Sequence, residues 1–142
     1  MKSFLDTSVL IPAFLGDHPH HKSSLDILAQ CTPKEAACAA HSLLEVYSVL
    51  TRMPGKNRIS GDQAMLFIGN IREHLSLVAL TAEESATALE QFAELGVMGG
   101  AIYDAHIAAC ALKVRAEQIY TWNVGHFSQL GSQVTRLLKY PG

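Results

Sequence analysis

The stretch Ser3-Phe4-Leu5-Asp6-Thr7-Ser8 near the N-terminus decides the fold that we predict for this chain. Residues 2–5 have the apolar character of a short buried strand, and Asp6 closes it. Thr7 and Ser8 then offer hydroxyl groups that can cap a short helix over residues 9–14. A buried strand that leads directly into a helix is typical of α/β folds.

Strand and helix patterns alternate along the rest of the chain. Pro33, Pro54-Gly55 and Gly96 mark helix ends, and Ser60-x-x-Gln63 and Thr81-x-x-Glu84 are capping-box patterns. Strands are expected at 36–40, 77–80, 118–121 and 134–138, and helices from a cap at Asp17 to 30, from His41 or Ser42 to 52, and at 60–74, 81–95 and 102–115. The alternation predicts one α/β domain over residues 1–142 with a mostly parallel central sheet.

Composition limits the classes of protein that the chain can belong to. Of the 142 residues 49% are hydrophobic, which argues against disorder. No apolar run approaches the ~20 residues that span a bilayer, so we expect no membrane contact and a cytoplasmic location. The three cysteines lack paired metal spacing and are expected to be buried, small hydrophobic residues. The net charge of −2 gives no general attraction to nucleic acid, which would need a local basic patch or a bridging metal ion.

Three acidic residues stand in otherwise apolar segments far apart in the sequence: Asp6, Glu45 and Asp104. If folding gathers them at ~5 Å, each pair costs roughly 3 kcal/mol at an effective dielectric of ~20. We therefore expect such a cluster to hold a hard cation, Mg²⁺ or Mn²⁺. Sites in parallel α/β folds lie beyond the carboxyl ends of the strands, where Asp6, Thr121 and Asn123 are expected.

Each acid also has an ordinary structural interpretation. Asp6 can bond backbone amides in a turn, and Glu45 can belong to a solvated helix stripe with Arg52. Asp104 suits the positive end of a helix dipole. The small residues over 105–111 let that helix pack close to the sheet, which favours a role in the site for Asp104.

Other kinds of catalytic site find little support in the sequence. The histidines at 18, 20 and 21 are expected at the surface, and those at 41, 106 and 126 near the site lack zinc-ligand spacing. There is no phosphate-binding glycine loop and no Gly-x-Ser-x-Gly nucleophile motif. A phosphatase with an aspartyl intermediate would need a second Asp two residues after Asp6, where Ser8 stands.

Four motifs in this order carry a resemblance to a known family. They are Leu5-Asp6-Thr7-Ser8, Ala40-His41-Ser42-Leu43-Leu44-Glu45-Val46, Tyr103-Asp104-Ala105-His106-Ile107-Ala108-Ala109, and Tyr120-Thr121-Trp122-Asn123 with His126-Phe127. Together they resemble a PIN domain and, more narrowly, the VapC-type toxin ribonucleases of toxin–antitoxin pairs. The resemblance implies a three-layer α/β/α sandwich with a mostly parallel sheet and an Mg²⁺- or Mn²⁺-dependent site that cuts single-stranded RNA.

The resemblance also assigns roles to residues. Asp6, Glu45 and Asp104 match the three most regular acids of the family and are the expected catalytic and metal-binding residues. Thr7, Ser8, Thr121 and Asn123 are expected to orient ligands or water around them. The fourth acid that many members carry is replaced by Thr121-x-Asn123, and a later Asp by His126. This departure favours one bound ion, and it leaves open a catalytically weak binding module for RNA or protein.

Partners follow from the same resemblance and from the basic residues. Arg52, Lys56 and Arg58 follow the Glu45 segment, and we expect them to bind the RNA backbone. Lys113 and Arg115 are interpreted as surface charges. The family implies a homodimer and a small antitoxin whose tail enters the active-site groove.

Overall fold

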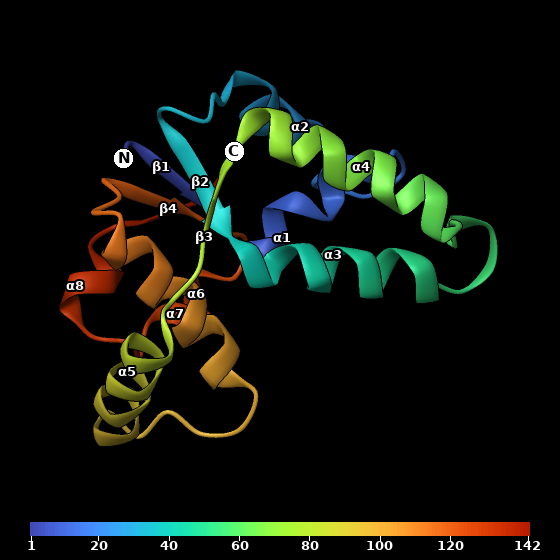
Figure 1. Ribbon diagram of the computed structural model, residues 1–142. Coiled ribbons are helices and arrows are strands. Elements are labelled where there is room, and N and C mark those ends of the chain that lie inside the picture. The colour runs from blue at the N-terminus through green and yellow to red at the C-terminus, as the bar shows by residue number, and fades with distance from the viewer.

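A five-stranded parallel sheet forms the centre of the computed structural model, which describes all residues from 1 to 142. The strands are β1 (Ser3–Leu5), β2 (Ala36–Ala39), β3 (Ser76–Val78), β4 (Gln118–Tyr120) and β5 (Leu138–Lys139), in the order β3-β2-β1-β4-β5 (Figure 1). Every neighbouring pair is parallel. The predicted α/β fold is confirmed, and its sheet is parallel throughout. All five carboxyl ends therefore meet at one edge, with β1 in the middle.

Helices cover both faces of this sheet. They are α1 (Thr7–Leu10), α2 (His21–Gln30), α3 (Ala40–Arg52), α4 (Gly61–His74), α5 (Ala82–Glu94), α6 (Ala101–Lys113), α7 (Val124–Phe127) and α8 (Ser132–Thr135), with 3₁₀ turns at Pro12–Phe14 and Gly55–Asn57. Figure 1 shows α3 and α4 side by side at one end of the molecule, and α5 and α6 at the other side of the sheet.

Two apolar cores separate the three layers, because successive strand residues point to opposite faces. Phe4 belongs to the core that holds Ile107 and Phe127, whereas its neighbour Leu5 belongs to the core that holds Val46 and Ile71. All six residues are at most 1% exposed. The expected three-layer sandwich is confirmed, and burial on both faces explains why the strands read as continuous apolar runs.

Helix caps were predicted correctly where a full motif was present. Thr81 and Glu84 form both hydrogen bonds of a capping box at the start of α5, and Ser60 accepts from the backbone N–H of Gln63 at the start of α4. Gly96, just past α5, has a φ of 80°, which a glycine adopts without strain.

Isolated polar residues predicted other helix starts wrongly. Thr7 and Ser8 lie inside α1 rather than capping it, since their hydroxyl groups are used by distant partners. Asp17 does not cap α2, which begins only at His21. The strand expected at 134–138 is also wrong: residues 132–135 form α8, and only Leu138–Lys139 pair with β4.

Two of the three cysteines are buried, as expected. Cys38 and Cys110 are buried and Cys31 is half-buried, all as free thiols. Burial raises the pKa of the Cys38 thiol to about 12, so it stays protonated and unreactive. No helix is both long and apolar enough to cross a membrane.

Candidate active site

Asp6 is a buried carboxylate at the carboxyl end of the central strand. It is only 2% exposed. Its Oδ2 accepts hydrogen bonds from Ser8 Oγ at 2.7 Å and from Thr121 Oγ1 at 2.8 Å. No Lys, Arg or His forms an ion pair with it. A buried charge is costly without a partner of opposite sign, so two hydroxyl groups alone leave Asp6 undercompensated.

Thr7 links this strand end to the second acid. Its Oγ1 lies 2.8 Å from Ser42 Oγ and 3.1 Å from Glu45 Oε1, both on α3. Thr7 and Ser42 are buried, so the contact fixes the N-terminal half of α3 against α1. Glu45 is thereby held over the same edge of the sheet as Asp6.

Glu45 lies on the wet side of α3, as its helical position predicts. His41 Nδ1, one turn earlier, is 3.2 Å from Glu45 Oε1. Glu45 and His41 share an open groove with Ser48 and Arg52 along the helix. The stripe expected from the sequence is therefore a wall of a surface groove, while Val46 and Leu50 are buried on the opposite side.

Asp104 lies in the first turn of α6, and its side chain is 27% exposed. Burial, together with the negative charges of Asp6 and Glu45, raises the pKa of its carboxyl to about 6. His126, whose Nδ1 lies 3.9 Å from Asp104 Oδ2, acts in the opposite direction. Asp104 thus interacts electrostatically with both of the other acids, which places the three predicted residues around one edge of the sheet.

The carboxylate chemistry of the three acids suits a hard divalent cation, but the side chains do not form a complete set of ligands. Nowhere do three or more His, Cys, Asp or Glu side chains stand close enough together to enclose a metal ion. Carboxylates repel one another at short range, so they stay apart when no cation is bound. Mg²⁺ keeps several of its waters and needs only one or two carboxylate ligands. A buried Asp6 without a cationic partner, next to an Asp104 that resists ionisation, is the environment that such an ion would stabilise.

Comparison with known proteins identifies the family of this chain. The model of the PIN domain family matches residues 3–130. The chain belongs to the PIN domain family. Ribonuclease VapC27 of Mycobacterium tuberculosis (strain ATCC 25618 / H37Rv) is 39% identical over 114 residues, which cover 80% of this chain and 79% of that relative. Ribonuclease VapC40 of the same species is 33% identical over 106 residues, 75% of each chain. The predicted resemblance to the VapC ribonucleases is confirmed.

Solved structures share the fold at lower sequence identity. Mycobacterium tuberculosis VapC20, described as a toxin that cleaves the sarcin-ricin loop, superposes with a TM-score of 0.71 at 22% identity, covering 92% of this chain and 95% of that one. The VapBC2 complex of Rickettsia felis, bound to a promoter DNA fragment, gives 0.66 at 19% identity, covering 99% and 98%. At these identities the likeness establishes the fold alone.

The end of β4 closes the PIN domain site through hydroxyl and backbone groups. Thr121 is fully buried, and its Oγ1 also accepts from the backbone N–H of Asn123 at 3.0 Å. The N–H of Trp122 donates to Ser8 Oγ at 3.0 Å. Thr121 and Ser8 therefore contact Asp6 directly, whereas Asn123 reaches the network only through its backbone.

Beside the acids, Ser42 was not assigned from the sequence, and His41 was expected near the site without a role. Ser42 contacts Thr7 and carries no chemical signature of its own, since serines are common near helix starts. The contact of His41 with Glu45 has a signal, the i,i+4 spacing on α3, which predicts adjacent side chains.

The basic residues predicted to bind RNA are spread along the far half of α3 and the loop after it. Arg52 shares the groove of Glu45, seven residues and about 10 Å along the helix axis from it. Lys56 is exposed in the turn after α3, and Arg58 Nε donates to the Met53 carbonyl. Lys113, interpreted as a surface charge, donates to Glu84 Oε1 at 2.7 Å and so ties α6 to α5.

Proposed function

We propose that this PIN domain is a divalent-metal-dependent endoribonuclease that hydrolyses phosphodiester bonds of single-stranded RNA. The observation that carries the proposal is the buried Asp6 carboxylate, which has no cationic partner and interacts with Asp104 across the carboxyl edge of the sheet. Its named relatives are ribonucleases. Asp6 and Asp104 would hold Mg²⁺ or Mn²⁺, with Glu45 binding directly or through water.

The bound ion would supply a water of lowered pKa and would neutralise charge on the phosphate oxygens. The protein supplies orientation. Ser8 and Thr121 fix one oxygen of Asp6, which leaves the other oxygen free to face a ligand. Thr7 and His41 hold Glu45 at the groove, where its carboxylate can accept a proton from an attacking water. Asn123 adds no charge, which favours a single ion.

RNA reaches this site along the groove of α3. Arg52 lines that groove together with Glu45, and Lys56 and Arg58 follow in the segment after α3. These three residues would neutralise backbone phosphates on the way to an acidic centre, which the overall charge of −2 cannot do.

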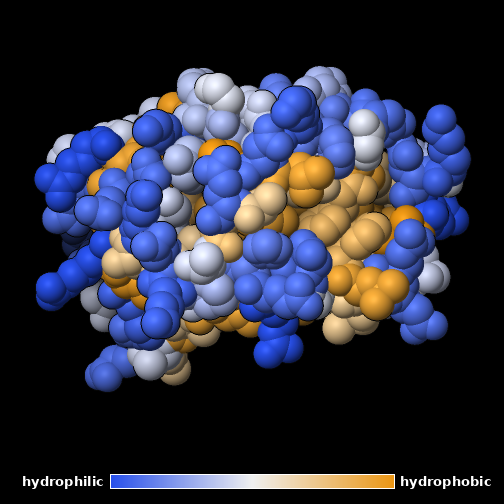
Figure 2. Space-filling view, turned by 90° about the horizontal axis from the view of Figure 1, so that it is seen from above, coloured by the Kyte–Doolittle hydropathy of each residue, from blue (hydrophilic) through white to orange (hydrophobic).

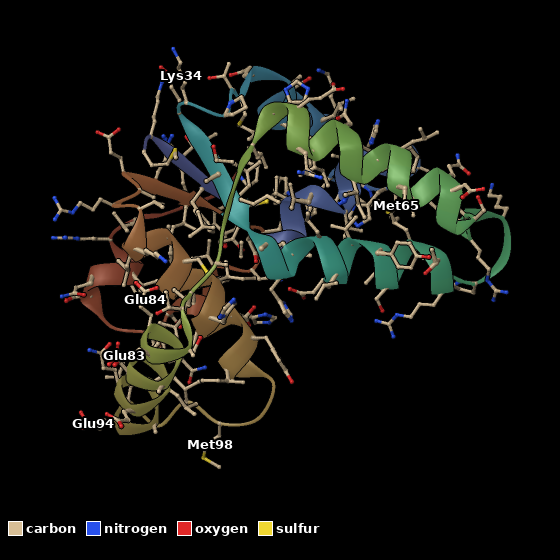
Figure 3. The ribbon with its side chains drawn as sticks, in the orientation of Figure 1. Lys34, Met65, Glu83, Glu84, Glu94 and Met98 are labelled. Atoms are coloured by element: carbon tan, nitrogen blue, oxygen red, sulfur yellow. The ribbon has the colours of Figure 1, made fainter.

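The chain would act as the toxin of a toxin–antitoxin pair and would be silenced by a small antitoxin. Solved neighbours include VapBC complexes, in which a toxin of this fold is bound to its antitoxin. An exposed apolar surface supports such a partner or a second copy: Leu44 and Tyr47 on α3, and Met65 and Leu66 on α4, are 41–73% exposed. Figure 2 shows apolar side chains gathered at the end of the molecule where α3 and α4 lie, and Figure 3 shows Met65 on α4. Apolar patches of this kind mark binding surfaces.

The decisive experiment is cleavage of single-stranded RNA by the purified chain with Mg²⁺, with Mn²⁺ and with a chelator. We expect metal-dependent cleavage that Asp6→Asn abolishes while the far-ultraviolet circular dichroism stays unchanged. Single-stranded DNA serves as the substrate control. Full activity of Asp6→Asn would reject the site. RNA binding without cleavage in either metal would instead favour the alternative function, a PIN-fold binding module, which the missing fourth acid supports.

A further inference from the structure

An apolar hollow of about 280 Å³ opens next to the acids, on the side away from Arg52. It lies between α3, α5 and α6, and neither the acids nor the basic residues line it. Its lining consists of His41, Leu80, Ser85, Ala88, Leu89, Phe92, Ile102, Tyr103 and His106. The volume is close to the lower end of the ~300–1,000 Å³ typical of small-molecule sites, which suits one flat ring system rather than a larger ligand.

Aromatic rings form one wall of this hollow. The rings of His41 and Tyr103 are nearly parallel, with an interplanar angle of 8° and centroids 5.8 Å apart. His106 meets His41 edge-on at 5.6 Å. The Tyr103 side chain is 58% exposed, although a tyrosine ring gains free energy when it is covered. A flat ring that enters the hollow would cover it.

Two connections tie this wall to the acid site. His41 contacts Glu45 Oε1 at 3.2 Å, and so belongs to both the hollow and the acidic groove. Tyr103 directly precedes Asp104 at the start of α6. A phosphate held at the acids would therefore have its attached nucleoside within reach of these rings.

We propose that the hollow binds the base of a nucleotide next to the scissile phosphate, stacked against Tyr103 and His41. This inference rests on the proposed function, because it takes the substrate to be single-stranded RNA. Unpaired bases stack on aromatic side chains, and the apolar floor formed by Leu89, Phe92 and Ile102 suits the face of a base. The Ser85 hydroxyl at the wall would contact the edge of the base and favour some bases over others. A protein partner is favoured less, because the exposed apolar residues on α3 and α4 lie outside the hollow.

The test measures RNA binding and RNA cleavage separately. An oligonucleotide carrying 2-aminopurine, whose fluorescence is quenched by stacking, is titrated with the wild type, Tyr103→Ala and Tyr103→Phe in the presence of chelator. We expect Tyr103→Ala to bind about 10-fold more weakly and to lose the quenching, as befits one lost base–aromatic stack. Tyr103→Phe should recover most of both, because it keeps the ring. Tyr140→Ala, a tyrosine 56% exposed outside the hollow, is the matched control and should bind like the wild type.

Cleavage of RNA that lacks a single base then shows which base binds in the hollow. Removing the base at one position beside the cut should slow the wild type to the rate of Tyr103→Ala and should not slow Tyr103→Ala further. Equal binding and equal quenching by the wild type and Tyr103→Ala would overturn the proposal, as would a base removal that slows both proteins alike. If the wild type cuts no RNA, the proposed function fails by itself. The quenching titration still decides whether Tyr103 stacks on a base.

Discussion

Replacing Asp104 by Asn should stabilise the metal-free protein while it abolishes metal-dependent cleavage. Burial and the negative charges of Asp6 and Glu45 all oppose the ionisation of Asp104. Asn has nearly the same shape and no charge. The substitution therefore removes the repulsion and keeps the packing of α6. A bound cation would relieve the same repulsion and needs the charge of Asp104 to do so. Stability of the metal-free protein and activity should therefore move in opposite directions.

The magnitude follows from the pKa. Its rise from 3.8 to about 6 corresponds, at ~1.4 kcal/mol per pH unit, to an upper limit of about 3 kcal/mol. The side chain is 27% exposed, so water screens part of this energy. The lost interaction with the helix dipole costs roughly 0.3–1 kcal/mol more. We expect a net gain of about 1 kcal/mol at pH 7.5, or about 3 °C in Tm for a chain of this size.

The pH dependence has a defined sign. A carboxyl whose pKa is higher in the folded state favours folding when protonated. Its contribution is fully present below pH 3.8 and is lost as the pH rises through about 6. The advantage of Asp104→Asn should therefore be largest above pH 6 and should vanish near pH 4. With Mg²⁺ or Mn²⁺ the order should reverse, because the ion stabilises only the wild type.

The assay is urea unfolding of both proteins in chelator at pH 4 and 7.5, followed by thermal unfolding with added metal. Asp62→Asn is the matched control, since Asp62 is also a first-turn acid but is exposed. It should lose a few tenths of a kcal/mol at pH 7.5 and less at pH 4. The reasoning is refuted if Asp104→Asn destabilises the metal-free protein as Asp62→Asn does, or if its gain persists at pH 4.

Two further predictions concern the end of β4. Thr121→Val keeps the shape of the side chain but removes a hydroxyl that donates to the buried Asp6, so it should cost about 2 kcal/mol in urea unfolding. Thr135→Val, at a partly exposed threonine outside the site, is its control, and an equal loss in both variants would contradict the role of Thr121. Asn123→Asp adds the missing negative charge and should tighten Mn²⁺ binding by calorimetry. An unchanged or weaker affinity would count against Asn123 as a neighbour of the ion.

Local patterns predicted much of the fold and part of the site. Strands buried on both faces must be apolar throughout, so β1 and β2 stood out, and the capping box at Thr81 depends on neighbours three residues apart. The strand expected at 134–138 failed because α8 interrupts it and only two residues pair with β4. A short edge strand is defined by its partner, and that partner is not visible in the local sequence.

The three acids illustrate the same division at the site. Their residue type and their positions after a strand or on a helix can be read along the chain, and so can the family motifs that contain them. Whether a carboxylate is buried without a cationic partner, as Asp6 is, depends on what surrounds it after folding. The contacts of Thr7 with Ser42 and of Thr121 with Asp6 join residues 35 and 115 positions apart. Only packing sets such distances, because side-chain hydrogen bonds act over about 3 Å in space and leave no periodic signal in the sequence.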